Sequence, residues 1–339
     1  MDSQCNRVVE RCDRKIADNF KNFDFCGTQP CKNGQICSNI LRSGNTIDYE
    51  CLENFGSEIS QSSIKKFHVG SESYIFYGND IVKTSKDFLH HTKLPYTNGT
   101  LAGLWHDNEK MISVSKKGDF KLVGNSFETL IAYPQNQRAL KQGVSCLKVY
   151  KNIAVTCGLD GNIGVWDITD PENPYFSKKL YGFSDEVTAV AVNDRFIVGG
   201  DADIYGGADN DGNINIYSLD GVFLRSYAGH TKGIKSLFLH RGMLFSSSWD
   251  DSIHISNPET GEQLQVIKTP QAYGLMAVGG NHLVAYHDRR LRFFDIDNLK
   301  SKKDLLVKEM DANFGRVYEI SVDEDYLIVA GGKLFKIRI

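Results

Sequence analysis

The chain has 339 residues and a formal net charge of -3 at pH 7, with 41% hydrophobic and 24% charged residues. This is the composition of an ordinary globular protein, and a charge so close to neutral argues against a dedicated binder of nucleic acid or of an anionic membrane surface. The sequence has no run near the roughly 18 apolar residues of a membrane span, and its charged start lacks the apolar region of a secretory signal. We therefore expect a cytoplasmic or nuclear protein.

The first predicted element is a short amphipathic helix at about residues 3–20. Val9, Cys12, Ile16 and Phe20 follow one another at spacings of three and four residues, which places them on one helical face. The simplest interpretation is a helix packed on the rim of a larger domain. An alternative is a helix that docks a partner, because VVERCDRKIADNF resembles the last helix of an F-box, a module of ubiquitin-ligase receptors.

A cysteine-rich segment follows at residues 26–51, and with the helix it forms a predicted extension, residues 1–57. We expect an irregular segment with reduced, partly buried thiols. One alternative is a zinc site, because thiolates are preferred zinc ligands; its ligands would be Cys26, Cys31, Cys37 and Cys51. Another follows from CGTQPCKNGQIC, which resembles the first half of an EGF-like module and would require disulfides in an oxidising compartment.

From residue 64 onward the sequence repeats itself seven times. The copies begin at residues 64, 101, 144, 187, 234, 273 and 317, and each consists of an alternating strand, a polar turn and a second apolar strand that ends in small residues. A period of about 40–45 residues is typical of four-stranded propeller blades. The alternation indicates strands that bury one face against a neighbouring sheet.

A tight turn and a third strand are predicted after each second strand. LDGNIGVWD (159–167) is the clearest example, and residues 210–218, 249–257 and 287–295 keep its frame, while 116–124 and 331–339 are degraded copies. The Asp-Gly pair favours a two-residue hairpin, because glycine accepts the positive φ of the turn. Fourth strands are predicted in most copies, for example within 223–230 and 263–269.

These motifs resemble the WD-repeat family over about residues 60–339. The resemblance implies an all-β fold, a seven-bladed β-propeller over residues 58–339, in which a buried histidine, serine and aspartate are hydrogen-bonded to a tryptophan. The residues that match this structural network are His230, Ser246, Asp250, Asp160 and Trp166. They come from two different copies: Ser256 occupies the tryptophan position of the His230 copy, and the Trp166 copy has no preceding Gly-His pair.

The last copy ends after three strands, so a propeller would need a fourth strand from elsewhere to avoid an unpaired edge. We expect residues 46–54 or 58–64 to supply this outer strand.

The loops of such a fold direct the functional prediction. Asp201, Asp203, Asp209 and Asp211 could offer oxygen ligands to calcium, but Gly207 breaks the run and the late glutamate of a calcium loop is missing, so we expect a solvated loop. The sequence carries no familiar catalytic motif. We therefore predict a non-enzymatic scaffold in a multi-subunit complex. It should bind other proteins and need no cofactor, small-molecule substrate, nucleic acid or membrane. The alternatives are a ubiquitin-ligase substrate receptor and a propeller hydrolase acting at the central channel. The residues predicted to bind partners are Phe183, Tyr205, Trp249, Tyr273, His287, Arg289, Arg290 and Phe314.

Overall fold

The structure is a computed structural model, and it describes the strands of residues 35–132 and most of the chain from residue 143 onward. The described ranges are 35–42, 46–54, 66–69, 73–77, 81–85, 91–94, 100–105, 110–115, 120–124, 129–132, 143–170, 174–202, 212–269, 275–287, 289–297, 299, 305–311, 317–323, 325–331 and 334–339. Within these ranges no helix is long and apolar enough to cross a membrane. The chain divides into two compact units, residues 66–275 and residues 1–65 with 276–339.

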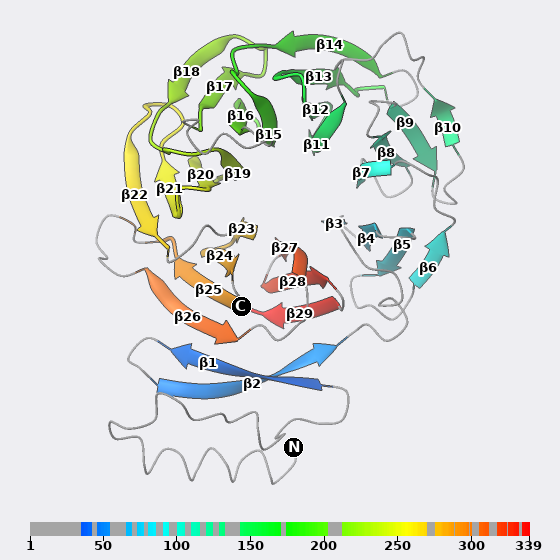
Figure 1. Cartoon of the computed structure of the whole chain (residues 1–339). Helices are drawn as coiled ribbons and strands as arrows, with labels where there is room; N and C mark the ends of the chain where they lie inside the picture. Colours follow the sequence, from blue (N-terminus) through cyan, green and yellow to red (C-terminus); the bar gives the residue numbers. More distant parts are fainter. Residues whose placement is uncertain are drawn as a thin grey trace. The chain divides into compact units, whose positions relative to one another are not determined.

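The unit of residues 66–275 contains five antiparallel sheets of four strands each, and each sheet is built from strands consecutive in the chain (Figure 1). The first strand of one sheet packs against the first strand of the next, as β11 does against β15 and β15 against β19. The strands of these sheets are β3 (Lys66–Val69), β4 (Ser73–Tyr77), β5 (Ile81–Ser85), β6 (His91–Leu94); β7 (Thr100–Trp105), β8 (Lys110–Ser115), β9 (Phe120–Gly124), β10 (Thr129–Ala132); β11 (Val144–Tyr150), β12 (Ile153–Gly158), β13 (Ile163–Asp167), β14 (Tyr175–Leu180); β15 (Glu186–Val192), β16 (Phe196–Ala202), β17 (Ile214–Ser218), β18 (Phe223–Tyr227); and β19 (Ile234–His240), β20 (Met243–Ser248), β21 (Ser252–Ser256), β22 (Gln263–Lys268).

The other unit holds one nine-stranded sheet in the order β23-β24-β25-β26-β1-β2-β29-β28-β27. Its strands are β1 (Gln35–Arg42), β2 (Thr46–Asn54), β23 (Leu275–Gly279), β24 (His282–His287), β25 (Arg290–Asp295), β26 (Leu306–Asp311), β27 (Val317–Asp323), β28 (Tyr326–Gly331) and β29 (Leu334–Arg338). The last three strands of the chain gain β2 as a fourth, through the pairs Glu53↔Lys336 and Asn54↔Phe335. The prediction that residues 46–54 complete the last sheet is therefore confirmed.

The same hairpin also reaches the preceding strand group. β1 pairs with β26 through Ile40↔Met310, Leu41↔Glu309 and Arg42↔Lys308, so two groups of four strands merge into one sheet. This corrects the prediction of an irregular segment at residues 26–51, because residues 35–42 and 46–54 form strands. The predicted helix at residues 3–20 lies outside the described residues.

The repeated sequence pattern produces the sheets for two local reasons. β15 begins with the predicted alternation of buried and less buried residues, whereas β11 buries only Val144 and Leu147, and β12, β13 and β16 are buried at nearly every position. The turn between β12 and β13 is tight, with the Gly161 amide donating to the Gly158 carbonyl at 3.3 Å. Residues 159–162 join the two strands, so the loop is longer than the predicted two-residue hairpin, and Gly161 adopts the left-handed conformation with a φ of +69°, as in hairpin loops of three or more residues.

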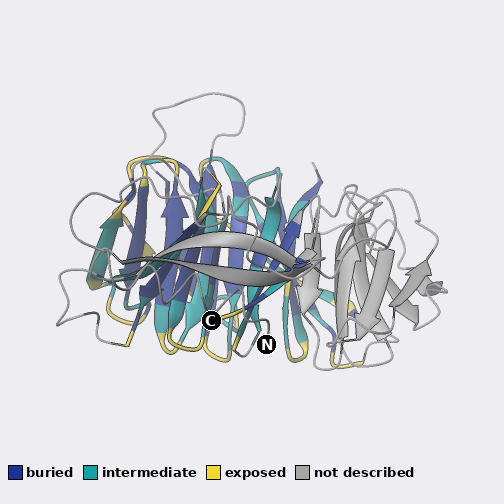
Figure 2. Ribbon diagram, turned by 90° about the horizontal axis from the view of Figure 1, so that it is seen from below, coloured by how far each residue is buried: buried dark blue, intermediate teal, exposed yellow. Residues whose placement is uncertain are grey.

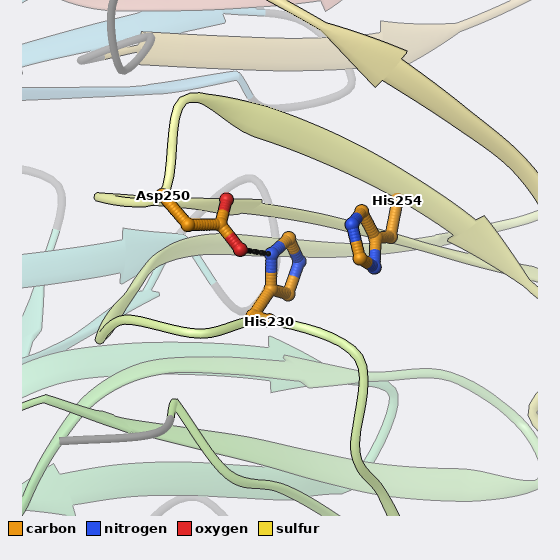
Figure 3. Close-up of side chains that lie close together, drawn as sticks. All are labelled: His230, Asp250 and His254. Atoms are coloured by element: carbon orange, nitrogen blue, oxygen red, sulfur yellow. Dashed lines mark hydrogen bonds and ion pairs between the residues drawn. The ribbon is translucent and has the colours of Figure 1, made fainter.

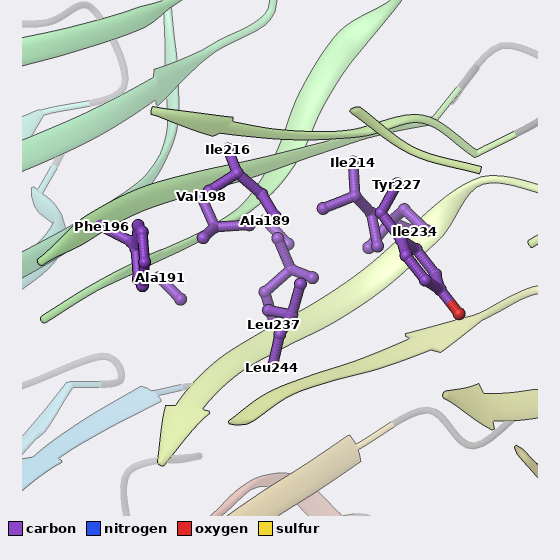
Figure 4. Packing of buried hydrophobic residues seen from close by; sticks show 10 residues of the cluster. All are labelled: Ala189, Ala191, Phe196, Val198, Ile214, Ile216, Tyr227, Ile234, Leu237 and Leu244. Carbon is purple, nitrogen blue, oxygen red and sulfur yellow. The ribbon is translucent and has the colours of Figure 1, made fainter. Parts of the chain in front are cut away.

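The core lies between consecutive sheets. One cluster joins β15–β18 to β19 and β20 (Figure 4), and its buried members are Ala189, Ala191, Phe196, Val198, Ile214, Ile216, Tyr227, Ile234, Leu237 and Leu244. Most buried residues lie in the strands, and many exposed residues lie in the turns at the strand ends (Figure 2), while the outer strands β14, β18 and β22 also carry exposed residues. The sheets β15–β18 and β19–β22 thus present their turns on a framework fixed by apolar packing.

Candidate functional site

A buried hydrogen-bonded network lies in the sheet β19–β22 (Figure 3). His230 precedes β19, Ser246 lies in β20, and Asp250 lies in the turn between β20 and β21. The His230 ring is 2.9 Å from the Asp250 carboxylate through Nδ1 and 2.8 Å from the Ser246 hydroxyl through Nε2. The structure therefore brings together three of the five residues predicted for the structural network.

The hydrogen-bond directions follow from the Asp250 carboxylate. Burial raises the pKa of Asp250, but hydrogen bonds from Ser252, from the Thr231 amide and from His230 outweigh burial, so its pKa is lowered overall. The ionised carboxylate accepts from His230 Nδ1. Nε2 of the neutral imidazole is then an acceptor, and the Ser246 hydroxyl donates to it. Burial lowers the pKa of His230 despite the opposing effect of Asp250, which keeps the ring neutral near pH 7.

A second histidine, not anticipated from the sequence, extends this network. The ring of His254, in β21, stacks on that of His230 with centroids 3.8 Å apart and planes 21° apart. Tyr227 donates its hydroxyl to Gln263 at 3.0 Å and lies 3.1 Å from His254 Nδ1. Since the tyrosine hydrogen is directed to Gln263, His254 Nδ1–H donates to the tyrosine oxygen. Ser256, at the tryptophan position of this copy, is buried.

Electrostatics favour the neutral forms of His254 and Tyr227. Burial, with a further contribution from the charge of His230, lowers the pKa of His254 to about 4. Burial and the Asp250 carboxylate raise the pKa of Tyr227 to about 12. Both side chains are therefore uncharged near pH 7, and each proton is held in a hydrogen bond.

The Ser246–His230–Asp250 network has the same order of side chains as a catalytic triad, but the resemblance ends there. Ser246 is 0% exposed and His230 is 4% exposed, whereas a nucleophilic serine must reach a substrate carbonyl. His230, Asp250 and His254 offer ligand atoms within 4.8 Å of one another, but both His230 nitrogens already have protein partners and the two rings are stacked. A metal would need in-plane nitrogen lone pairs, so the geometry fits a structural role better.

The other two predicted network residues lie in the sheet β11–β14. Trp166 donates its indole N–H to the Thr156 hydroxyl at 3.4 Å, and Asp160 forms an ion pair with Lys179 at 2.8 Å. A threonine thus replaces the serine, and a lysine replaces the histidine as the partner of the turn aspartate. The five predicted network residues are therefore divided between two sheets, with His230, Ser246 and Asp250 in one and Asp160 and Trp166 in the other.

Trp249 is the most prominent of the predicted partner-binding residues. It lies in the turn between β20 and β21 and is 57% exposed. Lys235 Nζ lies 3.6 Å from the centroid of its ring, and burial lowers the pKa of Lys235, although Asp251 opposes the shift. The backbone amide of Trp249 donates to the Gly233 carbonyl at 3.1 Å. The exposed indole therefore stands on a well-fixed turn.

The remaining predicted partner-binding residues differ in their environments. Phe183 is half-buried and packs against Tyr217, with ring centroids 6.3 Å apart. In the other unit His287 is half-buried and Arg289 is exposed. Arg290 is exposed and bonds to Glu309 at 2.6 Å. Tyr205, Tyr273 and Phe314 lie outside the described residues.

The two metal hypotheses from the sequence remain predictions. Cys37 and Cys51 are register partners in the hairpin β1–β2, while Cys26 and Cys31 lie outside the described residues. Of the calcium candidates, Asp201 is buried, and its carboxylate accepts the amides of Asn213 at 2.7 Å and Ser184 at 3.2 Å. Burial raises the pKa of Asp201 despite these bonds. Asp203, Asp209 and Asp211 lie outside the described residues.

Exposed apolar side chains on the outer strands were not anticipated from the sequence. They lie at or next to the outer strands β14 and β18: Tyr175, Tyr181, Val222, Phe223 and Leu224. Phe223 also packs edge-on against Tyr217 at 5.7 Å, so part of this surface is tied to the core.

Comparison with known proteins supports the fold. Residues 221–256 match the family described as WD domain, G-beta repeat, while no curated protein matches the sequence. A chain in a crystal structure of the Mitotic Checkpoint Complex aligns with a TM-score of 0.67 and 16% identity, over 88% of this chain and 94% of that one. The computationally designed Ika8 protein aligns with a TM-score of 0.60 and 19% identity, over 84% and 98%. The predicted all-β fold with four-stranded propeller sheets is thereby confirmed.

Proposed function

The chain carries a WD40 repeat in a β-propeller fold, and from this premise we propose that it is a non-enzymatic scaffold that binds other proteins through its loops. WD40 propellers are commonly interaction scaffolds, and one of the similar chains belongs to a multi-protein complex. We further propose that the protein is a subunit of such a complex in the cytoplasm or nucleus.

The observation that carries this proposal is the support beneath Trp249. The next residue in the chain, Asp250, accepts hydrogen bonds from the Ser252 hydroxyl and from the Thr231 amide, the latter at 3.0 Å, besides its contact with His230. The turn is therefore ordered before any partner arrives, and binding costs little conformational entropy. Tryptophan is among the commonest interface hot spots, and an exposed tryptophan on a rigid turn is a suitable anchor.

The test compares Trp249→Ala with a matched aromatic truncation on an outer strand, Phe223→Ala. Both side chains are more than half exposed, but only Trp249 lies in a loop between second and third strands. Tagged full-length variants would be purified from cells, and the co-purifying proteins quantified by mass spectrometry. We expect W249A to lose one set of partners by tenfold or more, the effect of about 1.4 kcal/mol, while F223A retains them. An unchanged partner set in W249A would refute the proposed anchor.

A further inference from the structure

Two cysteines face each other directly in the sheet β11–β14. Cys146 in β11 and Cys157 in β12 are register partners, their Cα atoms are 5.1 Å apart, and their sulfurs are bonded. This separation lies within the range that a disulfide spans. Cys157 is 0% exposed, whereas Cys146 is only partly buried. An external reagent can therefore approach the pair from the Cys146 side.

The neighbouring sheets carry other residues at the equivalent pair of positions. Each pair follows a register shift of the first strand, which identifies the positions as equivalent. The sheet β15–β18 has Ala189 opposite Gly200, and the sheet β19–β22 has Ser236 opposite Ser247. The two serine hydroxyls are 2.7 Å apart. The fold therefore accepts this pair of positions without a covalent link, joined by a hydrogen bond or not at all.

In the reduced form of the cysteine pair, the Cys157 thiol also has a hydrogen-bond partner in place. The Ser145 oxygen lies 3.2 Å from Cys157 Sγ, and its own hydroxyl donates to the Val187 carbonyl of the next sheet at 2.8 Å. A Cys157 thiol could therefore donate its S–H to the Ser145 oxygen. Burial of an unpaired polar group would be costly, and this contact removes most of that cost.

We propose that Cys146 and Cys157 form a reversible thiol–disulfide site that exchanges with small thiols and disulfides of the glutathione class. A thiolate attacks Cys146 Sγ, a mixed disulfide forms there, and Cys157 leaves as a thiolate that takes up a proton. A second thiolate attacks the sulfur of the small molecule in the mixed disulfide. The small disulfide is released and the Cys146 thiolate takes up a proton, so the protein gains two electrons and two protons. A small disulfide oxidises the pair by the reverse steps.

The site has a defined structural consequence. The disulfide links the first two strands of the sheet next to Ser145, which contacts the next sheet through Val187. Reduction removes this link from both the folded and the unfolded chain, and the folded sheet becomes easier to open. The redox state of the surroundings would thereby set the stability of this sheet. Reversible and redox-sensing disulfides are the kind found in reducing compartments, in agreement with the proposed location.

The direct test is a redox titration of the full-length protein in glutathione buffers of increasing oxidised fraction. Acid stops the exchange, and the denatured protein is then alkylated near neutral pH, where the free thiols react. Lys148 and Lys151 lie between the two cysteines, so trypsin places Cys146 and Cys157 on different peptides that only the disulfide joins. Mass spectrometry then gives the linked fraction. We expect it to rise from near zero in reduced glutathione to near completeness in glutathione disulfide, and to reverse in the folded protein. The proposal would be overturned if both cysteines were alkylated at every ratio of glutathione to glutathione disulfide. It would also be overturned if reduced glutathione did not reduce the Cys146–Cys157 disulfide.

Two sets of variants separate the site from general effects on stability. Cys146→Ser with Cys157→Ser recreates the serine pair of the sheet β19–β22, and we expect this variant to fold and to lose the dependence of its Tm on reductant. The wild-type Tm should fall by a few degrees on reduction. A reductant effect of equal size in the double variant would contradict the assignment.

Ser145 is assigned as a positioning residue for the reduced thiol. Ser145→Ala should shift the titration midpoint about five-fold toward the disulfide, because the reduced form loses a hydrogen bond. Thr188→Ala is the matched control. Thr188 donates to the Ile234 carbonyl of the next sheet at 2.7 Å, as Ser145 donates to the Val187 carbonyl, but Thr188 contacts neither Cys146 nor Cys157. An equal midpoint shift in both variants would overturn the role of Ser145.

Discussion

Acidification should destabilise the sheet β19–β22 through His254. In the folded chain burial and the neighbouring His230 lower the pKa of His254 to about 4, from an ordinary value of 6.5. The folded chain therefore resists a proton that the unfolded chain accepts. The sign follows directly: stability is unaffected by this group above pH 6.5, falls as the pH drops from 6.5 toward 4, and levels off below 4.

The magnitude can be worked from the two pKa values. A full shift of this size corresponds to about 3 kcal/mol, at about 1.4 kcal/mol for each pKa unit. At pH 5.5 the loss should be roughly 1 kcal/mol, and at pH 4.5 between roughly 2 and 3 kcal/mol. These values apply while His254 stays buried, at 4% exposure. They are an upper range, because any local opening that admits water would reduce the pKa shift of His254.

The assay is urea unfolding of the wild type and of His254→Gln at pH 7.0, 5.5 and 4.5. Glutamine keeps a polar group near Tyr227 but does not titrate. Other groups contribute to the pH dependence of both proteins, so the informative quantity is the difference between the two curves. We expect the wild type to lose about 2 kcal/mol more than the variant between pH 7.0 and 4.5. Parallel curves would refute the reasoning, since they would mean that His254 titrates with an ordinary pKa.

Two further predictions concern the turn between β20 and β21. Asp250→Ala removes the acceptor for His230, Thr231 and Ser252. We expect it to lower the free energy of unfolding, measured by chemical denaturation, by about 3 kcal/mol. A loss under about 1 kcal/mol would contradict the network. Asp251 is exposed and has a φ of +60°, so Asp251→Gly should stabilise the protein by roughly 0.5 kcal/mol in the same assay, because glycine adopts this conformation without strain. Destabilisation by the glycine would show that the aspartate side chain contributes more than its backbone costs.

The sequence predicted the strands well because alternation and Asp-Gly turns are local signals. The outer strand from residues 46–54 was also predictable, since an incomplete last repeat requires a partner. The site was predictable only in part. His230, Ser246 and Asp250 belong to a known motif, but His254 takes part through ring stacking, for which the sequence carries no spacing rule. Tyr227 comes from the outer strand of the preceding sheet and reaches His254 only because the two sheets pack together.

The cysteine pair was not predicted, although the sequence holds a signal for it. β11 and β12 are joined by a two-residue turn at Lys151 and Asn152, and this turn fixes the register of the hairpin. Counting outward from the pair Tyr150↔Ile153 places Cys146 opposite Cys157. Register counting in short hairpins can therefore identify facing cysteines from the sequence alone, because cross-strand neighbours are set by the turn.

The hairpin β1–β2 has a consequence for synthesis of the protein. Its strands pair with β26 and β29, which leave the ribosome after β3 to β25, whereas the hairpin itself precedes all of these strands. Until then the hairpin has no place to dock, and the nascent chain must carry it through the production of nearly every other strand. Such distant pairing slows the final step of folding and exposes unpaired strand edges to association in the meantime. The nascent chain should therefore depend on chaperones most in the interval before β26 and β29 have been made.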